Sequence, residues 1–238
     1  MNYVILLAGG SGTRMNAPVA KQHINIGGHQ IIEYTLHVFE KSKSVDRIIV
    51  VSNPVFIKQI ENLQEKYSKL VNVIVGGSSR SMSVYNAINH LALYCDDNDK
   101  VVLSDAVRPC ITSKEIEECF LKLDSFPAVT TGVEVYETIL RTSNQELVDI
   151  IQRDGIIRQT SPEAYLFSIL KKLYIDTDIE IVKQYRNIGI DQLYSMGINI
   201  GIVKSTPLNF KITTQEDLYY FDSIIKRGFE QLMFNDCE

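Results

Sequence analysis

The sequence predicts an α/β fold in which helices flank a mainly parallel sheet and one β-arm protrudes from it. Apolar runs alternate with segments of helical periodicity along the chain. These runs are continuously apolar, which is typical of parallel strands covered on both faces. The alternation fails only between residues 135 and 161, which indicates the arm. We interpret residues 1–238 as one domain, because this length suffices for a single large core.

The first half of the chain alternates regularly. The expected strands are Tyr3–Leu7, Arg47–Ser52, Val71–Val75, Lys100–Ser104 and Ala128–Val133. Two expected helices span Ile31–Ser42 and Ser81–Leu93. Asn53-Pro54 opens another, which runs to about Ser68, and the capping box Thr112–Glu115 begins a fourth. The second half is less regular. There we expect a helix restarting at Ser161-Pro162-Glu163, a strand near Asn199–Lys204, an extended piece at Asn209–Thr213 and a final helix from Thr214.

The 135–161 segment is too long for an ordinary connection in a compact domain. Short β-like runs surround its polar turns, and it has too few apolar residues to form a core alone. Its runs Ile139-Leu140 and Ile150-Ile151 would be exposed unless another surface covered them. A two-fold pair that exchanges arms would cover them, so we expect a homodimer.

Composition limits the class of protein. Apolar residues make up 45% of the chain and charged residues 22%, with a net charge of −5, which argues against nucleic acid as a partner. We expect no signal peptide and no membrane span, because no apolar run is long enough. The cysteines, Cys95, Cys110, Cys119 and Cys237, lack metal or disulfide spacing, which favours a reducing cytoplasm.

A glycine-rich turn, residues 8–12, follows the first strand, and Thr13, Arg14 and Lys21 come after it. Glycines let backbone N–H groups close around an anion, and the two cations add full charges. This combination suits a polyphosphate, although a tight surface turn with two solvated basic residues is an alternative. The segment is not a P-loop, and Met15 stands where a dinucleotide fingerprint needs a small residue.

Two further segments follow expected strands, at the sheet edge where α/β proteins bind ligands. In the 76–84 segment, glycines allow close approach of a base and Ser83 offers a hydroxyl; a glycine turn with a serine N-cap is the alternative. In the 103–109 segment, Asp105 is a natural oxygen ligand for Mg²⁺ beside a phosphate site. The alternative is that Asp105 pairs Arg108 to stabilise a turn.

The residues LAGGSGTRM followed by AKQ resemble the sugar-nucleotide pyrophosphorylase superfamily, and more narrowly the cytidylyltransferases of the methylerythritol-phosphate and ribitol-phosphate type. Ala20 replaces the proline of that family's PKQ. The resemblance implies a Rossmann-like nucleotidyltransferase fold and Mg²⁺ as cofactor. It implies catalytic roles for Arg14 and Lys21. It implies nucleotide binding by Leu7, Ala8, Gly9, Gly10, Ser11, Gly12, Thr13, Gly77, Ser78, Arg80, Ser83, Ser104 and Ala106. It implies metal binding by Asp105 and Asn209, and acceptor binding by Arg108, Glu137, Thr138, Arg153 and Lys211.

The chain departs from this family at several positions. Ser104 stands where histidine is frequent, Glu163 where glutamine is usual, and Asn187-Ile188-Gly189 roughly where a Thr-Asp-Ala segment is expected. Solvated surface charge is the alternative for Arg153 and Lys211. In the family, the arm residues reach the acceptor site of the partner subunit.

These observations predict an enzyme that joins CTP to a small polyol phosphate, giving a CDP-polyol and pyrophosphate. An acceptor oxygen would attack the α-phosphorus in line, so the protein mainly positions and neutralises. Ribitol 5-phosphate or a glycerol phosphate, for capsule or teichoic-acid synthesis, is favoured; methylerythritol phosphate is the alternative. A nicotinamide-dependent dehydrogenase is disfavoured by Met15. A non-catalytic nucleotide-binding module is disfavoured because Arg14, Lys21 and Asp105 are all present.

Overall fold

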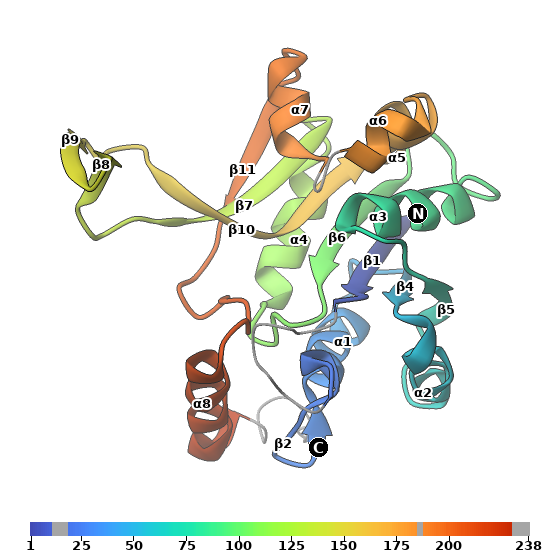
Figure 1. Ribbon diagram of the computed structural model, residues 1–238. Coiled ribbons are helices and arrows are strands. Elements are labelled where there is room, and N and C mark those ends of the chain that lie inside the picture. The colour runs from blue at the N-terminus through green and yellow to red at the C-terminus, as the bar shows by residue number, and fades with distance from the viewer. Residues whose placement is uncertain (11–18, 185–187, 230–238) are drawn as a thin grey trace.

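A computed structural model describes residues 1–10, 19–184 and 188–229 (Figure 1). Its centre is a seven-stranded sheet of order β11-β7-β10-β6-β1-β4-β5. The strands are β1 (Asn2–Ala8), β4 (Arg47–Ser52), β5 (Leu70–Val75), β6 (Lys100–Asp105), β7 (Ala128–Glu134), β10 (Ile157–Leu166) and β11 (Ile200–Lys204). Neighbours pair in parallel except β10, which is antiparallel to both β6 and β7. The predicted mainly parallel α/β sheet is confirmed.

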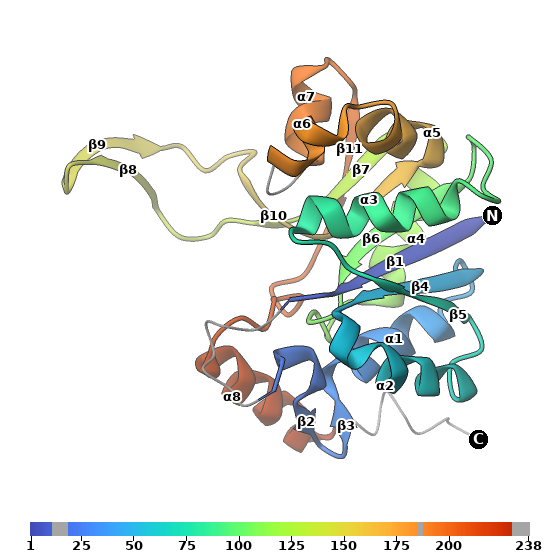
Figure 2. The ribbon, with the colours of Figure 1, turned by 45° about the vertical axis from the view of Figure 1, so that its right-hand side comes forward.

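Helices cover both faces of the sheet (Figure 2). They are α1 (Ile31–Lys41), α2 (Ile57–Glu61), α3 (Arg80–Leu91), α4 (Ser113–Lys122), α5 (Phe167–Leu170), α6 (Ile179–Gln184), α7 (Ile190–Ser195) and α8 (Gln215–Ile224). On β1, Val4 and Leu6 join the core that α1 and α4 cover, whereas Tyr3 and Ile5 join the core under α3. Successive residues of a strand point to opposite faces, so a strand buried on both faces must be apolar throughout.

Local signals place several element ends correctly. The Asn53 side chain accepts a hydrogen bond from the Val55 N–H, and Pro54 begins the next turn. The expected single helix after it is instead three short pieces, Pro54–Phe56, α2 and Asn62–Glu65. The capping box of Thr112 and Glu115 is present at the start of α4. Thr214 caps α8 by accepting from the Asp217 N–H.

The expected helix start at Ser161-Pro162-Glu163 is wrong. These residues lie inside β10, where Glu163 pairs with Leu103 on one side and Thr130 on the other. The register shifts between Gln159 and Glu163, and a bulge of this kind accommodates a proline that cannot donate to the ladder. Pairing on both sides outweighs the local helix-start pattern, and helix begins only at Phe167.

The arm is a hairpin of β8 (Ile139–Ser143) and β9 (Glu146–Ile151) that projects from the sheet (Figures 1 and 2). It ends sooner than expected, because residues 157–159 already pair with β7. Leu140 is 53% exposed and Ile150 54% exposed, as expected for apolar arm residues without a cover in this chain.

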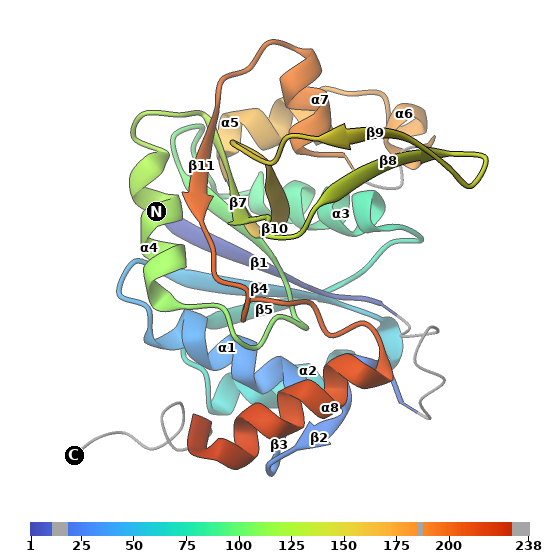
Figure 3. The ribbon, with the colours of Figure 1, turned by 90° about the vertical axis from the view of Figure 1, so that its left-hand side faces the viewer.

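Residues 205–214 connect β11 to α8 and pass the carboxyl ends of the central strands (Figure 3). Ile212 and Phe221 pack with Tyr34 of α1 and with Val107, which follows β6. A small hairpin, β2 (Asn25–Ile26) with β3 (His29–Gln30), completes this cluster. In the part of the chain that the structure describes, no helix is long and apolar enough to cross a membrane.

Candidate active site

The loops after β1 and β5 meet at the start of α3. The Gly77 N–H donates to Ser83 Oγ at 3.1 Å, and that hydroxyl donates to the Ser79 carbonyl at 2.9 Å. A Cβ on Gly9 would lie 3.8 Å from the same Ser83 Oγ. The N-cap of α3 is Ser79, not Ser83, so Ser83 is left to join the two loops. The structure therefore brings together Gly9, Gly77 and Ser83 from the predicted nucleotide-binding set.

Gly77 must be a glycine for steric reasons, which yields a first prediction. A Cβ at this position would lie 2.4 Å from Met82 Cβ and 2.7 Å from the Met82 backbone carbon. We expect Gly77→Ala to push the loop off α3, with a loss of about 1–3 kcal/mol in unfolding free energy and weaker CTP binding. Denaturant unfolding measures the first effect. Gly10→Ala is the matched stability control, because its Cβ meets nothing within 4 Å. Equal stability of the two variants would contradict the prediction.

Lys21 and Gln22 lie in a 3₁₀ turn, Lys21–His23, that contacts the glycine loop through Gln22. The Lys21 side chain is buried, and its Nζ donates to the Ile212 carbonyl at 2.7 Å. Gln22 Nε2 donates to the carbonyls of Ala8 and Gly10, at 2.6 and 3.1 Å, and so holds the start of the loop. Gln22 is not among the predicted site residues, although it adjoins Lys21 in the AKQ segment.

Ala20 has φ −60° and ψ 136°, a conformation that proline also adopts, so the replacement of proline is compatible with this backbone. Four predicted site residues, Ser11, Gly12, Thr13 and Arg14, lie outside the described residues.

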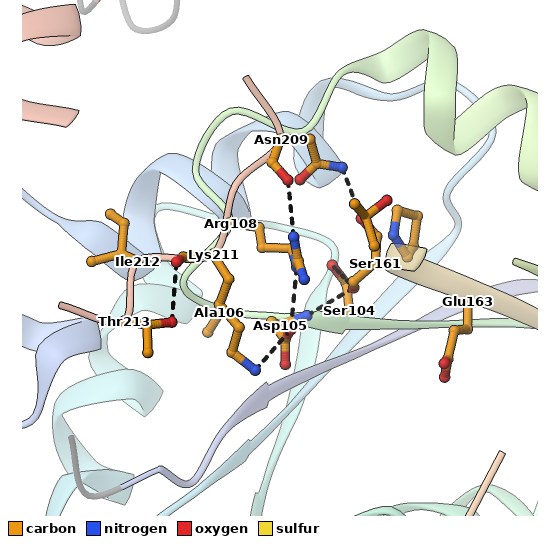
Figure 4. Close-up of polar contacts among 12 residues, drawn as sticks. Ser104, Asp105, Ala106, Arg108, Ser161, Glu163, Asn209, Lys211, Ile212 and Thr213 are labelled. Atoms are coloured by element: carbon orange, nitrogen blue, oxygen red, sulfur yellow. Dashed lines mark hydrogen bonds and ion pairs between the residues drawn. The ribbon is translucent and has the colours of Figure 1, made fainter. Parts of the chain in front are cut away.

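Asp105, at the end of β6, is surrounded by cations (Figure 4). Its Oδ2 lies 3.2 Å from Arg108 Nε and 3.0 Å from Lys211 Nζ. Burial acts to raise the pKa of this carboxyl, but the positive charges of Lys211, Arg108 and Arg80 hold it below its ordinary value. The carboxylate is therefore ionised at neutral pH. The Asp105–Arg108 pair that the alternative interpretation predicted is present. Lys211, from a distant segment of the chain, also contacts Asp105.

An ionised carboxylate beside a phosphate site fits Mg²⁺, which commonly takes one or two protein carboxylates and fills its shell with phosphate oxygens and water. Among the described residues, no group of three or more His, Cys, Asp or Glu side chains could hold a metal by itself. Asp105 could therefore supply only part of the ligand shell of the Mg²⁺ that the resemblance implies.

Asn209, the second predicted metal ligand, has a side-chain oxygen that is buried without a hydrogen-bond partner among the described residues, and this oxygen is the atom that would bind a metal. Its side chain is fully buried, and its Nδ2 donates to the Ser161 carbonyl at 2.8 Å and to Glu115 and Ser205. Its backbone carbonyl accepts from Arg108 Nη1 at 2.9 Å, which joins the residue to the Asp105 cluster, and its role as a metal ligand stays a prediction. The amide is needed to tie the 205–214 segment to β10 and α4.

Ser104 and Ala106 flank Asp105 but are buried, at 1% and 0% exposure. The Ser161 hydroxyl donates to Ser104 Oγ and accepts from the Asp105 N–H, both at 3.3 Å. The Ala106 carbonyl accepts from Thr35 Oγ1 at 3.0 Å. The side chains of Ser104 and Ala106 are therefore packed inside the loop, and their predicted contact with the nucleotide stays a prediction.

The remaining predicted residues differ in their contacts and exposure. Leu7 is bound to the Asp105 cluster through its carbonyl, which accepts from the Ala106 N–H at 3.0 Å. Ser78 is exposed in the loop before α3. Glu137, Thr138 and Arg153 are exposed on the arm, where Arg153 Nη1 donates to the Tyr136 carbonyl. The arm that carries these three residues projects from the sheet (Figure 2).

Comparison with known proteins agrees with this geometry. Residues 2–227 match the family described as IspD, 2-C-methyl-D-erythritol 4-phosphate cytidylyltransferase. The chain is 34% identical, over 94% of its length, to the bifunctional ribulose 5-phosphate reductase/CDP-ribitol pyrophosphorylase Bcs1 of Haemophilus influenzae, and spans 48% of that protein. It is 29% identical to the ribitol-5-phosphate cytidylyltransferase of Lactiplantibacillus plantarum, over 95% of this chain and 99% of that one.

A solved structure is similar as well. The 2-C-methyl-D-erythritol 4-phosphate cytidylyltransferase of Francisella tularensis superposes with a TM-score of 0.75 at 28% identity, over 93% of this chain and 98% of that one. These relatives confirm the resemblance seen in the glycine loop, and they support a nucleotidyltransferase instead of a dehydrogenase or a non-catalytic module. The chain belongs to the IspD family of cytidylyltransferases.

Proposed function

We propose that this cytidylyltransferase uses ribitol 5-phosphate or a glycerol phosphate as its acceptor, releasing pyrophosphate and a CDP-polyol for capsule or teichoic-acid assembly. The observation that carries the proposal is the group of cations at the strand ends. Lys211 and Arg108 contact Asp105, and Lys21 is tied to Ile212, the residue after Lys211. Such a group suits two phosphorylated substrates. The two relatives whose names include ribitol products or substrates support the choice of acceptor.

In this proposal each side chain has a separate task. The loops at Gly9 and Gly77 hold the nucleotide with their backbone groups, and Lys21 stabilises charge that builds on the α-phosphate and the leaving pyrophosphate. Arg14, outside the described residues, shares that task. Lys211, with a side chain 38% exposed, can leave Asp105 and bind the acceptor phosphate. Mg²⁺ bound at Asp105 would supply further charge neutralisation between the phosphates.

Methylerythritol phosphate is the second candidate acceptor, because the family description and the Francisella neighbour both carry its name. A pyrophosphate-release screen decides between them. CTP, UTP, ATP and GTP are each paired with ribitol 5-phosphate, glycerol 3-phosphate and methylerythritol 4-phosphate. We expect CTP with ribitol 5-phosphate to give the highest kcat/KM. A higher value with methylerythritol 4-phosphate would replace the proposed acceptor, and comparable use of UTP would contradict the assignment of CTP as the nucleotide substrate.

We propose further that the active unit is a homodimer in which each arm completes the acceptor site of the other chain. The support is the exposed apolar surface of the arm, Leu140, Leu147, Val148 and Ile150, each more than half exposed. Exposed apolar patches of this kind mark interaction surfaces, and a two-fold pair would cover both copies at once.

Mixing two inactive variants tests this arrangement. Lys21→Ala removes a group at the nucleotide, and Arg153→Ala removes one that would act in the other chain. If sites are shared, each mixed dimer has one site with both residues intact and one with neither. Random exchange makes about half of the dimers mixed, so activity should recover to roughly a quarter of wild type. No recovery, with mixed dimers verified by native mass spectrometry, would mean that Arg153 does not act across the dimer.

A further inference from the structure

Glu163 is a buried carboxylate to which the mechanism above assigns no task. It lies on β10, and its side chain is only 8% exposed. Its Oε1 accepts from Gln159 Nε2 at 2.9 Å, and its Oε2 accepts from the Tyr165 hydroxyl at 3.0 Å. A buried carboxylate also needs a cation, because hydrogen bonds alone leave its charge uncompensated. That cation is Arg80, whose Nη2 lies 3.4 Å from Glu163 Oε2.

Glu163 is held firmly enough to act as an anchor. Gln159 is itself fixed by a 3.1 Å hydrogen bond to Thr130 Oγ1 on the neighbouring strand β7. On another side, Gly189 lies close: a Cβ there would be 3.3 Å from the Tyr165 hydroxyl and 3.7 Å from Glu163 Oε2. Contacts from several elements therefore restrict the rotamer of Glu163, and with it the point at which Arg80 is bound.

Arg80 links this anchor to the loop that precedes α3. It is the first residue of α3 and directly follows the glycine loop at Gly76-Gly77. Burial acts to lower the pKa of Arg80, but Glu163 and then Asp105 raise it above its ordinary value. Two carboxylates on neighbouring strands thus attract the same guanidinium.

We propose that Glu163 is a positioning residue for CTP binding: it anchors the Arg80 guanidinium beside the nucleotide loop. A guanidinium has five N–H donors in a rigid plane, so an anchor at one edge directs the remaining donors. Those donors would face the phosphates of CTP, which rests on the proposed placement of the nucleotide at the loops after β1 and β5.

Calorimetric titration of CTP without acceptor tests this role, because no turnover takes place. Glu163→Gln keeps the shape of the side chain and replaces the carboxylate with the glutamine that is usual in the family, so it tests whether CTP binding in this chain depends on the charge. We expect the Kd of CTP to rise about tenfold, or about 1.4 kcal/mol. Arg80→Met should raise the Kd at least as much, and adding Glu163→Gln to Arg80→Met should change it no further. Glu118→Gln, which removes an exposed carboxylate paired with Lys114, is the matched control and should bind CTP like wild type.

The outcomes separate the alternatives. Additive effects of the two substitutions would overturn the proposal, because Glu163 would then act independently of Arg80. An unchanged CTP Kd with a raised acceptor KM would also overturn it and place Glu163 in direct contact with the acceptor. Tyr165→Phe removes one donor to Glu163 and provides a second route if Glu163→Gln does not fold; here a Kd equal to that of wild type overturns the proposal. Failure of the wild-type protein to bind CTP would instead refute the proposed nucleotide site itself.

Discussion

Replacing Lys21 with alanine is expected to lower kcat by ~10²–10³-fold, equivalent to ~3–4 kcal/mol of transition-state stabilisation. The charge of Lys21 is most useful when negative charge builds on the α-phosphate and pyrophosphate, so CTP affinity should fall much less. The position of the side chain favours this role, because burial and the hydrogen bond to the Ile212 carbonyl hold the ammonium in one place. A preorganised charge acts without the cost of reorienting at the moment of reaction.

Replacing Lys21 also has a structural consequence, and the controls must separate it from the loss of charge. Alanine leaves the Ile212 carbonyl without this donor and so can shift Lys211, the neighbouring residue. Lys21→Met keeps the packing of the side chain and should lose as much kcat as alanine while keeping the unfolding free energy closer to wild type. Lys183→Ala, which removes an exposed lysine paired with Glu180, should leave both quantities unchanged. A kcat of Lys21→Ala within about threefold of wild type would exclude Lys21 from the transition state.

The Asp105→Asn substitution is expected to raise the Mg²⁺ concentration needed for half-maximal rate and to slow turnover by roughly 10–100-fold. An amide oxygen is a weaker ligand for a hard cation than a carboxylate, and the change also removes the counter-ion of Arg108 and Lys211. A Mg²⁺ titration of the rate measures the first effect. Asp222→Asn, on the surface of α8 beside Lys226, is the matched control. An unchanged Mg²⁺ titration would place the metal on other ligands or on the phosphates of CTP alone.

The same carboxylate predicts a dependence of stability on pH. The pKa of Asp105 is lower in the folded chain than its ordinary value of 3.8, so the folded state binds fewer protons near that pH. The ion pairs therefore stabilise the fold above the ordinary pKa, and this contribution is lost as the pH falls through the lowered value. Wild type should lose more unfolding free energy than Asp105→Asn between neutral and acid pH. Equal losses would show that Asp105 does not contribute to the acid sensitivity of the fold.

The amino-acid sequence by itself determined the strands of the central sheet except β10. Strands such as Arg47–Ser52 are read correctly because their pattern is local: a strand covered on both faces must be apolar at every position. The approach of Gly9 and Gly77 was predictable for a related reason. Parallel strands end at the same edge of a sheet, so the loops after β1 and β5 had to lie together once the sheet was known.

Only the tertiary structure decided how distant segments meet. Ser161-Pro162-Glu163 carries a pattern typical of a helix start, but pairing with both β6 and β7 makes it a strand. Nothing local to Asp105 indicates that Lys211 will contact it, or that Lys21 will bind the Ile212 carbonyl. The Asn209 amide likewise belongs to a network with Ser161 and Glu115, far from it in sequence. These contacts follow from the order of the strands and the path of the 205–214 segment. Periodicity and capping patterns involve only a few neighbouring residues, so they contain no information about strand order or about that path.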